Sequence, residues 1–391
     1  MTLLQPKQQS YSLLFQVSAL TTSRTVINTG FRMIYPLLPV FARSVNVEIT
    51  TLATLLTLTQ LLGLTAPFIG TISERQGRKF TILLGLLTYT IGMLVVFIAP
   101  NFMGLALALL IASFGKMAFD PALQAYVGDR TPYNKRGMYL GIVELAWSGA
   151  FLIGVPAMTW LIATYNWQAP FAALSILAGF GLLAAWYLLE SDKPTVVQRA
   201  SFGTIFRLAV DSRIAIAGLV LGFSISAANQ LVNVVFGSWI EVSFGVQLAA
   251  LAAAAFVIGA SELGGEGVVT FFADKFGKRR LVILGIGGNI IACLILPFTS
   301  FSLTAALVGL FFFYLTFELS LVATIPLATE LSPNARAMYM TLLVSAFTFG
   351  RAVFTPLAPL LFNYGLLANV LVAIGLNLVA LVAVWKFIHG K

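Results

Sequence analysis

Residues 70–85 read GTISERQGRKFTILLG, and residues 270–285 read TFFADKFGKRRLVILG. Each segment places an acidic residue, a glycine and a basic run directly before an apolar stretch. The aligned positions are Glu74 with Asp274, Gly77 with Gly277, Arg78 with Lys278, and Lys79 with Arg279. Farther along, Asp129-Arg130-Thr131-Pro132 corresponds in the same way to Glu330-Leu331-Ser332-Pro333. The two pairs of segments are separated by nearly the same number of residues, which predicts a chain built from two related halves.

Long apolar runs surround these polar segments. Hydrophobic residues make up 59% of the chain and charged residues only 9%, whereas a soluble domain carries about 25% charged residues. A transmembrane helix needs about 20 apolar residues, and the uncharged runs at 80–115 and 145–189 are each much longer than one such helix. The composition therefore predicts an all-α membrane protein and disfavours a soluble helical core.

Twelve transmembrane helices are predicted, six on each side of the longest polar segment. The predicted spans are residues 15–42, 50–72, 80–98, 102–127, 137–162, 169–190, 212–240, 246–271, 280–299, 303–328, 337–362 and 366–388. They predict an N-terminal six-helix bundle at 1–190, a cytoplasmic linker at 191–211 and a C-terminal six-helix bundle at 212–391.

The lysines and arginines predict the orientation of these spans. Nearly all that lie outside the spans fall in alternate connections, and Arg43 is the one that falls on the opposite side. Basic connections stay in the cytoplasm, so both termini are predicted to be cytoplasmic in a multi-pass protein of the inner (plasma) membrane. The formal charge of +9 is explained by topology, and no nucleic-acid partner is expected. The first residues lack the apolar core of a cleavable signal peptide, so no cleavage is expected.

Cysteine and histidine are nearly absent, which limits the chemistry. Cys293 is the single cysteine and His389 the single histidine. A disulfide framework, a cysteine-based metal cage and a histidine-based catalytic triad are therefore excluded. No metal, cofactor or enzymatic activity is expected, and any proton chemistry in the membrane must use carboxylates.

The repeated segment resembles a motif of the major facilitator superfamily. In that family, the connection between the second and third spans carries Gly-x-x-x-Asp-Arg-x-Gly-Arg-Lys, and this chain has Glu74 at the aspartate position. In the second copy, Thr270 stands at the first glycine position. Residues 166–171 also look like the family's entry to the sixth span. The resemblance implies the major facilitator fold, in which two pseudo-symmetric six-helix bundles flank a central cavity, and a monomer that works by alternating access.

The resemblance also implies a conformational latch. In the family, contacts of this motif link the halves in the outward-facing state, and Glu74 and Asp274 would make them here, with Arg136 and Arg336 as partners. For the basic residues, a second interpretation has equal weight: they only anchor the connections on the cytoplasmic side. The latch set is Gly70, Glu74, Arg75, Gly77, Arg78, Lys79, Asp129, Arg136, Asp274, Gly277, Lys278, Arg279, Arg280, Glu330 and Arg336.

The pattern is closest to the 12-helix drug:proton antiporter branch of the family. The fifth span of that branch carries glycine and proline, and here Gly149, Gly154 and Pro156 occupy it without forming the usual pair. That branch often has an arginine in the upper fourth span. None lies near Leu109, and Lys116 is the nearest basic residue.

Charged residues within the spans are the candidate proton-coupling groups, because a charge at mid-membrane is costly and faces a cavity or a partner. At about 1.5 Å per residue, Asp120 lies about 13 Å from the membrane edge, Glu318 about 18 Å and Glu144 about 10 Å. Lys116 and Asp120 are four residues apart and share one helix face. Two interpretations remain open: a self-neutralising pair that permits insertion, or a pair that substrate or proton disrupts. Asp120 is the first candidate for coupling, followed by Glu144 and Glu318.

A second set of residues is predicted to line the substrate cavity. Arg32 is expected either to bind an anionic group or to neutralise Asp120 or Glu144, whereas Arg24 is expected to extend toward the cytoplasm. The cavity candidates are Arg32, Lys116, Arg351, Glu262, Tyr35 and Trp147.

These features predict a secondary active transporter whose partners are a small-molecule substrate, protons and the lipid bilayer. Export of small organic molecules driven by proton entry is the favoured function. Uptake or exchange of an anionic metabolite is the alternative, suggested by Arg32, Lys116 and Arg351. A lipid flippase or a membrane-embedded enzyme is the third possibility, although the spans contain no nucleophile–base or metal-ligand constellation.

Overall fold

The computed structural model describes residues 11–64, 73, 76–132, 135–191, 207, 210–245, 247–332 and 336–388, and helices make up nearly all of them. The N-terminal half contains α1 (Leu13–Arg32), α2 (Leu38–Ser44), α3 (Ile49–Gly63), α5 (Arg78–Ile98), α6 (Phe102–Arg130), α7 (Arg136–Gly149), the π-helical turn η2 (Ala150–Gly154), α8 (Val155–Thr164) and α9 (Ala169–Leu188). The C-terminal half contains α11 (Arg213–Asn233), α12 (Phe236–Phe244), α13 (Leu248–Phe276), α14 (Lys278–Ile295), the 3₁₀ turn η3 (Leu296–Thr299), α15 (Leu303–Leu331), α16 (Arg336–Phe354), α17 (Leu357–Phe362) and α18 (Leu366–Phe387).

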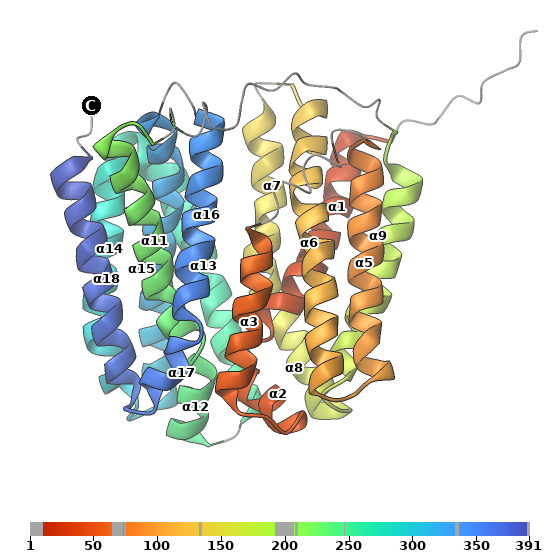
Figure 1. Ribbon diagram of the computed structural model, residues 1–391, viewed down its shortest axis with the longest axis horizontal. Coiled ribbons are helices and arrows are strands. Elements are labelled where there is room, and N and C mark those ends of the chain that lie inside the picture. The colour runs from red at the N-terminus through yellow and green to blue at the C-terminus, as the bar shows by residue number, and fades with distance from the viewer. Residues whose placement is uncertain are drawn as a thin grey trace, which may run out of the picture.

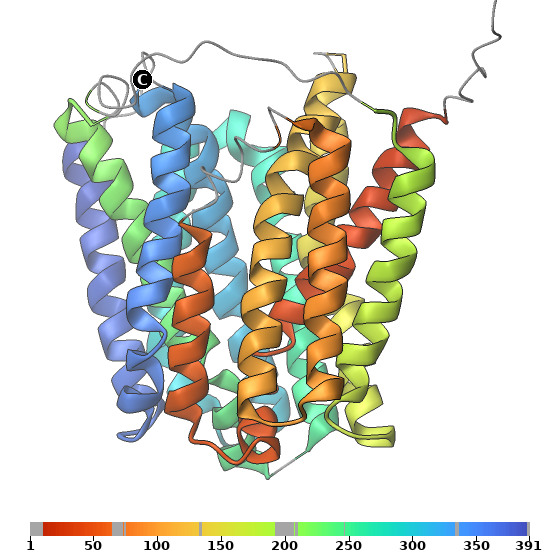
Figure 2. The ribbon, with the colours of Figure 1, turned by 45° about the vertical axis from the view of Figure 1, so that its right-hand side comes forward.

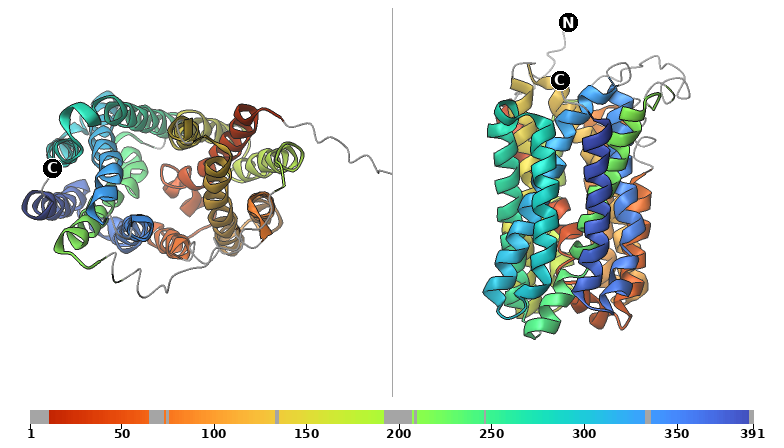
Figure 3. Two further views of the ribbon diagram at one scale, coloured as in Figure 1. Left: turned by 90° about the horizontal axis from the view of Figure 1, so that it is seen from above. Right: turned by 90° about the vertical axis from the view of Figure 1, so that its left-hand side faces the viewer.

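The helices form two groups that stand side by side (Figure 1). Within the described residues, nine helices are long and apolar enough to cross a membrane, and a tenth is added if the pair α2 and α3, bent by 111°, is counted. In the predicted order, α1 and α2 correspond to the first span, α3 to the second and the shorter apolar α16 to the eleventh. The first turn of α1 and the last turn of α18 lie at the same end of the molecule (Figure 3).

Several predicted spans are not single straight helices. The first span breaks between α1 and α2, the seventh between α11 and α12, and the eleventh between α16 and α17. Proline lacks a backbone N–H and clashes with the preceding turn, and Pro36 and Pro356 lie at two of these breaks. In the fifth span, Pro156 follows the π-helical turn. Such irregular backbone is tolerated in a membrane where neighbouring helices bury it.

The repeated segments have equivalent structural roles in the two halves. Gly77 and Gly277 adopt φ angles of 95° and 83°, a left-handed conformation that glycine adopts without strain. Lys79 Nζ donates to the Leu189 carbonyl at 2.6 Å, and Arg279 Nε donates to the Ile388 carbonyl at 2.6 Å. Each half therefore attaches its third span to its sixth through the same motif position.

The last glycine of each repeat sets the packing of the next two helices. A Cβ on Gly85 would lie 2.7 Å from the Gly115 carbonyl oxygen, and a Cβ on Gly285 would lie 2.6 Å from the Ser320 backbone nitrogen. Small residues let transmembrane helices approach closely. α5 therefore packs on α6 in one half as α14 packs on α15 in the other.

The two halves meet along two seams. α3 lies beside α16 (Figure 1 and Figure 2), and η2 with α8 lies against α13. On the second seam, a Cβ on Gly259 would lie 2.8 Å from the Leu152 backbone nitrogen. At the break that precedes α2, the Pro36 carbonyl oxygen would lie 2.3 Å from a Cβ on Gly237 of α12. Glycine thus permits direct backbone contact between the halves.

Candidate functional site

Four charged side chains form a compact group inside the N-terminal half. We call Arg24, Lys116, Asp120 and Glu144 the N-half charge cluster. Arg24 Nε lies 3.3 Å from Asp120 Oδ1, and its Nη1 lies 2.8 Å from Glu144 Oε1. Lys116 Nζ lies 2.8 Å from Asp120 Oδ2. The cluster contains two cations and two carboxylates, so its charges balance within one half.

The position of Arg24 differs from the sequence prediction. Arg24 does not extend toward the cytoplasm, because its side chain is only 3% exposed. It is held inside by the two carboxylates and by the Val143 carbonyl, to which Nη1 donates at 3.0 Å. A buried guanidinium is tolerated where several acceptors satisfy its fork of donors. Arg24 therefore belongs to the candidate site. Its position along the first span did not predict this, because that position says nothing about which helices the side chain faces.

The predicted contact between Lys116 and Asp120 is confirmed. Lys116 also donates to Asn28 Oδ1, and its Nζ lies 4.8 Å from the centroid of the Trp147 ring. Asn28 in turn donates to the Ala146 carbonyl at 3.3 Å. These contacts fix α1, α6 and α7 to one another around the pair.

Arg32 connects the two halves. Its Nη2 donates to Glu262 Oε1, and its Nη1 donates to the Trp147 carbonyl at 3.0 Å. The guanidinium carbon lies 3.8 Å from the centroid of the Phe151 ring. The expectation that Arg32 neutralises Asp120 or Glu144 is therefore wrong, since Arg24 fills that role and Arg32 pairs with a carboxylate of the opposite half.

Three carboxylates gather in the C-terminal half on α13 and α15. We call Glu262, Glu266 and Glu318 the C-half carboxylate group. Glu262 Oε2 is buried without a hydrogen-bond partner. Glu318 is 8% exposed, and within the described residues it makes no hydrogen bond or ion pair. Glu262 and Glu266 both lie within electrostatic reach of Glu318, as do Arg32 and Arg351.

Uncharged polar side chains join the halves beside these charges. Gln60 of α3 donates to the Tyr35 hydroxyl at 3.1 Å and to Thr355 Oγ1 at 3.2 Å. Thr355 also accepts from Gln230 Nε2 at 2.7 Å. Tyr35, one of the predicted cavity residues, therefore lies at the seam, and its role in a substrate cavity stays a prediction. Gln60 and Gln230 were not among the predicted site residues. Their amide side chains within apolar spans are the sequence signal that could have identified them.

A further ion pair joins the halves at the end where α2 and α12 lie (Figure 1). Arg43 donates to both carboxylate oxygens of Glu241, at 2.8 and 2.7 Å. Arg32, Arg43 and Gln60 thus each make a hydrogen bond or an ion pair that joins the halves. These contacts occur at mid-membrane and toward the α2–α12 end.

The predicted latch residues contact their own half. Arg78 lies 3.3 Å from Asp129, and Lys278 pairs with Glu330 in the equivalent place. Arg336 Nε donates to the Thr329 carbonyl at 3.0 Å, while Arg136 and Arg280 are exposed. Gly70, Glu74, Arg75 and the side chain of Asp274 lie outside the described part of the structure. The predicted partnerships of Glu74 and Asp274 therefore stay predictions.

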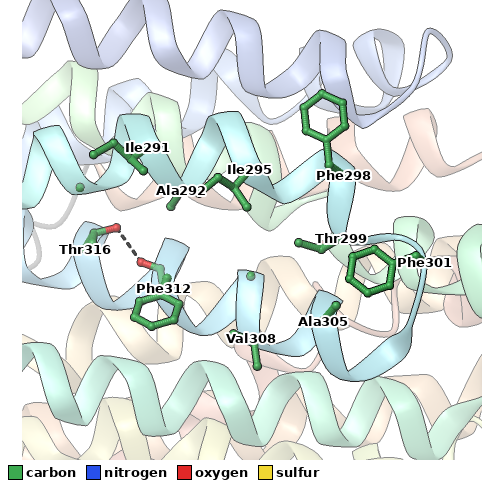
Figure 4. Close-up of a pocket in the computed structure, with 12 residues that line it drawn as sticks. Ile291, Ala292, Ile295, Phe298, Thr299, Phe301, Ala305, Val308, Phe312 and Thr316 are labelled. Atoms are coloured by element: carbon green, nitrogen blue, oxygen red, sulfur yellow. Dashed lines mark hydrogen bonds between the residues drawn. The ribbon is translucent and has the colours of Figure 1, made fainter.

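A separate apolar groove of about 720 Å³ lies between α14 and α15 (Figure 4). Ile291, Ile295, Phe298 and Phe312 line it, and Thr316 donates to the Phe312 carbonyl at 2.7 Å. No charged side chain lines the groove. Its chemistry is that of a lipid-facing surface, which distinguishes it from the charged site between the halves.

Two groups of apolar helices with buried charges near their seam define a polytopic membrane transporter. The profile of the Major Facilitator Superfamily matches residues 20–317 and 214–391. The chain therefore belongs to the major facilitator superfamily, a family of transporters and not of enzymes.

Individual relatives are distant. The chain is 25% identical over 295 residues to the tetracycline resistance protein, class C, of Escherichia coli, which covers 71% of this chain and 72% of that protein. It is 28% identical over 166 residues to multidrug resistance protein 2 of Bacillus subtilis, covering 42% and 41%. It is 29% identical over 140 residues to the uncharacterized transporter YwfA of Bacillus subtilis, of which only 34% is covered.

Solved structures share the fold. A bacterial homolog of the human lysosomal transporter Spinster superposes with a TM-score of 0.77 at 15% identity, covering 96% of this chain and 97% of that chain. A POT family transporter superposes with a TM-score of 0.75 at 16% identity, covering 95% and 94%. Identities this low support the shared fold and carry no information on substrate.

Proposed function

We propose that this transporter exports small organic molecules in exchange for protons. The named relatives support export, because their names describe resistance to tetracycline and to multiple drugs. The observation that carries the proton coupling is Glu318, a nearly buried carboxylate that lacks a cationic partner among the described residues. An unpaired charge in the membrane is costly, so this carboxyl group is suited to gain and lose a proton as its access to water changes.

The structure favours Glu318 over Asp120 as the proton carrier. Asp120 contacts both Lys116 and Arg24. Two cations stabilise the charged form of a carboxylate, so protonation of Asp120 would break two ion pairs at once. Glu318 has no such pair to lose. We therefore assign proton coupling first to Glu318, with Asp120 and Glu144 as members of a cluster that stabilises the N-terminal half.

The contacts between the halves support alternating access. Arg32, Gln60 and Arg43 join the halves from mid-membrane to the α2–α12 end. If the basic loops are cytoplasmic, as the positive-inside rule predicts, the α2–α12 end faces outward and the contacts hold that side closed. We propose that the repeated motif forms its latch when the opposite, outward-open arrangement is reached.

Transport in sealed proteoliposomes with an imposed pH gradient tests this function. The panel contains lipophilic cations, sugars and organic anions, and the parent is compared with Glu318→Gln and Asp120→Asn. Gradient-driven accumulation that is lost in Glu318→Gln, while downhill flux persists, is the expected result. Accumulation that survives in Glu318→Gln and fails in Asp120→Asn would return the coupling role to Asp120. Failure of every panel member to follow the gradient would overturn proton antiport.

One observation favours the anion-exchange alternative. Arg351 is partly buried, and within the described residues its guanidinium makes no hydrogen bond or ion pair. An arginine of this kind is able to bind a carboxylate through its planar fork. Gradient-independent exchange of an organic anion, abolished in Arg351→Gln and retained in Glu318→Gln, would establish that alternative.

A further inference from the structure

We propose that the C-half carboxylate group binds a planar organic cation with N–H donors, such as a guanidinium or amidinium group, and that this cation displaces Arg32 from Glu262. The inference rests on the proposed transport function, because it names the substrate class of the same site. It starts from the contacts that one of the protein's own guanidinium groups already makes there.

The guanidinium group of Arg32 occupies the proposed cation site in this structure. Its guanidinium meets the Glu262 carboxylate, the Trp147 carbonyl at 3.0 Å and the face of the Phe151 ring at 3.8 Å. A carboxylate and a carbonyl accept the in-plane N–H groups, while an aromatic face contacts the flat surface of the cation. This set of groups recognises a planar, delocalised cation better than a compact ammonium or a cation without N–H donors.

The site has acceptor capacity that Arg32 leaves unused. Glu262 Oε2 is buried without a partner, and a buried acceptor without a donor is costly. Glu318, 8% exposed, has no partner among the described residues. Glu262, Glu266 and Glu318 together outnumber Arg32 and Arg351, the two cations within electrostatic reach. An additional cation would supply the missing donors and balance the charge.

The same contacts argue against an anionic ligand at this position. Lys116 and Arg32, two of the predicted anion-binding residues, already contact Asp120 and Glu262. An anionic group beside Glu262 would meet the unused oxygens of the C-half carboxylate group. Repulsion between like charges in a low-dielectric site disfavours that arrangement.

Displacement of Arg32 would also change the contact between the halves. The Arg32–Glu262 pair joins α1 of one half to α13 of the other. A bound cation that takes Glu262 therefore removes a mid-membrane connection. A ligand shifts a conformational equilibrium toward the state that it binds more tightly. The bound cation would therefore favour an arrangement of the halves in which Arg32 and Glu262 are apart.

Binding of benzamidinium to the purified full chain in nanodiscs, measured by isothermal titration calorimetry, tests the inference. Tetraphenylphosphonium serves as a cation without N–H donors and benzoate as a planar anion. We expect Arg32→Gln to tighten benzamidinium binding by about tenfold, because an internal competitor is removed, and Glu262→Gln to weaken it by about tenfold. Matched charge removals outside the site, Arg213→Gln and Glu48→Gln, should change affinity by less than about twofold.

The outcomes separate this inference from the proposed function. Tighter binding in Arg32→Gln cannot arise from misfolding, so it supports the inference even if Glu262→Gln is unstable. Weaker benzamidinium binding in Arg32→Gln, equal affinity for tetraphenylphosphonium, or preferential binding of benzoate would overturn it. If benzamidinium does not bind but another panel compound follows the pH gradient, this inference fails and proton-coupled transport stands. If benzamidinium binds as expected and no panel compound follows the gradient, the binding site stands and the proposed function fails.

Discussion

The N-half charge cluster and the C-half carboxylate group are both within the membrane-spanning helices, yet they compensate their charges differently. In the N-terminal half, Arg24 and Lys116 contact Asp120, and Arg24 also contacts Glu144. In the C-terminal half, Glu318 is buried without a partner among the described residues, and the ion pair of Glu262 reaches across to Arg32 of the opposite half.

This difference shows that internal symmetry of the backbone does not require symmetry of the charges. Both halves use the same glycine turns and the same third-to-sixth span attachment. A buried ion pair that is complete holds helices in one arrangement, and removing one partner is strongly destabilising. A carboxylate without a partner is free to respond to a proton or a ligand. We therefore assign a mainly structural role to the first cluster and a mainly functional role to the second.

Removal of Arg24 should have the largest effect on stability. Arg24→Gln leaves Glu144 without its cation and Asp120 with one cation in place of two, so we expect a loss of about 3 kcal/mol in free energy of unfolding. The equivalent loss of Arg351, which has no partner among the described residues, should cost less than about 1 kcal/mol. Thermal unfolding of both variants in detergent measures the difference. Equal losses in the two variants would contradict the proposed division of roles.

Neutralising one carboxylate in each half sharpens the comparison. Asp120→Asn removes the negative charge that two cations share and should destabilise the protein by about 2 kcal/mol. Glu318→Gln removes an unpaired charge and should leave stability unchanged or raise it by about 1 kcal/mol, because the desolvation cost is relieved. Transport should show the reverse order, with proton coupling lost in Glu318→Gln. Thermal unfolding and proton-coupled transport are measured on the same preparations of Asp120→Asn and Glu318→Gln. A greater loss of both stability and coupling in one variant would contradict the expected reversal.

Symmetric substitutions at the helix contacts should affect both halves alike. Gly85→Ala and Gly285→Ala each place a Cβ within 2.7 Å of a backbone atom of the facing helix, and overpacking of this kind costs about 1–3 kcal/mol. The two losses should agree within about 1 kcal/mol, since the backbone environments are equivalent. A much larger loss in one half would mean that the repeats differ in packing as well as in charge.

The smallest effects are expected at the peripheral ion pairs. Arg78–Asp129 and Lys278–Glu330 are solvent-accessible pairs in which the carboxylates are 59% and 55% exposed. Exposed pairs contribute at most about 1 kcal/mol, so Asp129→Asn and Glu330→Gln should unfold within a few degrees of the parent. A change in transport rate without a change in stability would support the proposed latch, whereas unaltered transport would support a role as anchors of orientation.

The sequence by itself determined the features that depend on local pattern. The repeats around Gly77 and Gly277, the order of apolar spans and the i,i+4 pair Lys116–Asp120 all follow from spacing within a few turns of chain. Apolar run length and helix periodicity are local properties of the sequence. In a membrane they determine which segments form spanning helices. Family membership follows from the same motifs and is confirmed by the profile match. The division at 191–211 stays a prediction, because most of that segment lies outside the described residues.

Only the tertiary structure decided which charges meet. Arg24 was expected near the cytoplasmic surface and is instead buried against α6 and α7. Arg32 and Glu262 are far apart in sequence and in different halves, as are Gln60 and Thr355. Depth along one helix gives no information about the direction in which a side chain points relative to other helices. That direction is fixed by close glycine contacts and backbone breaks, and it decides whether a buried charge finds a partner.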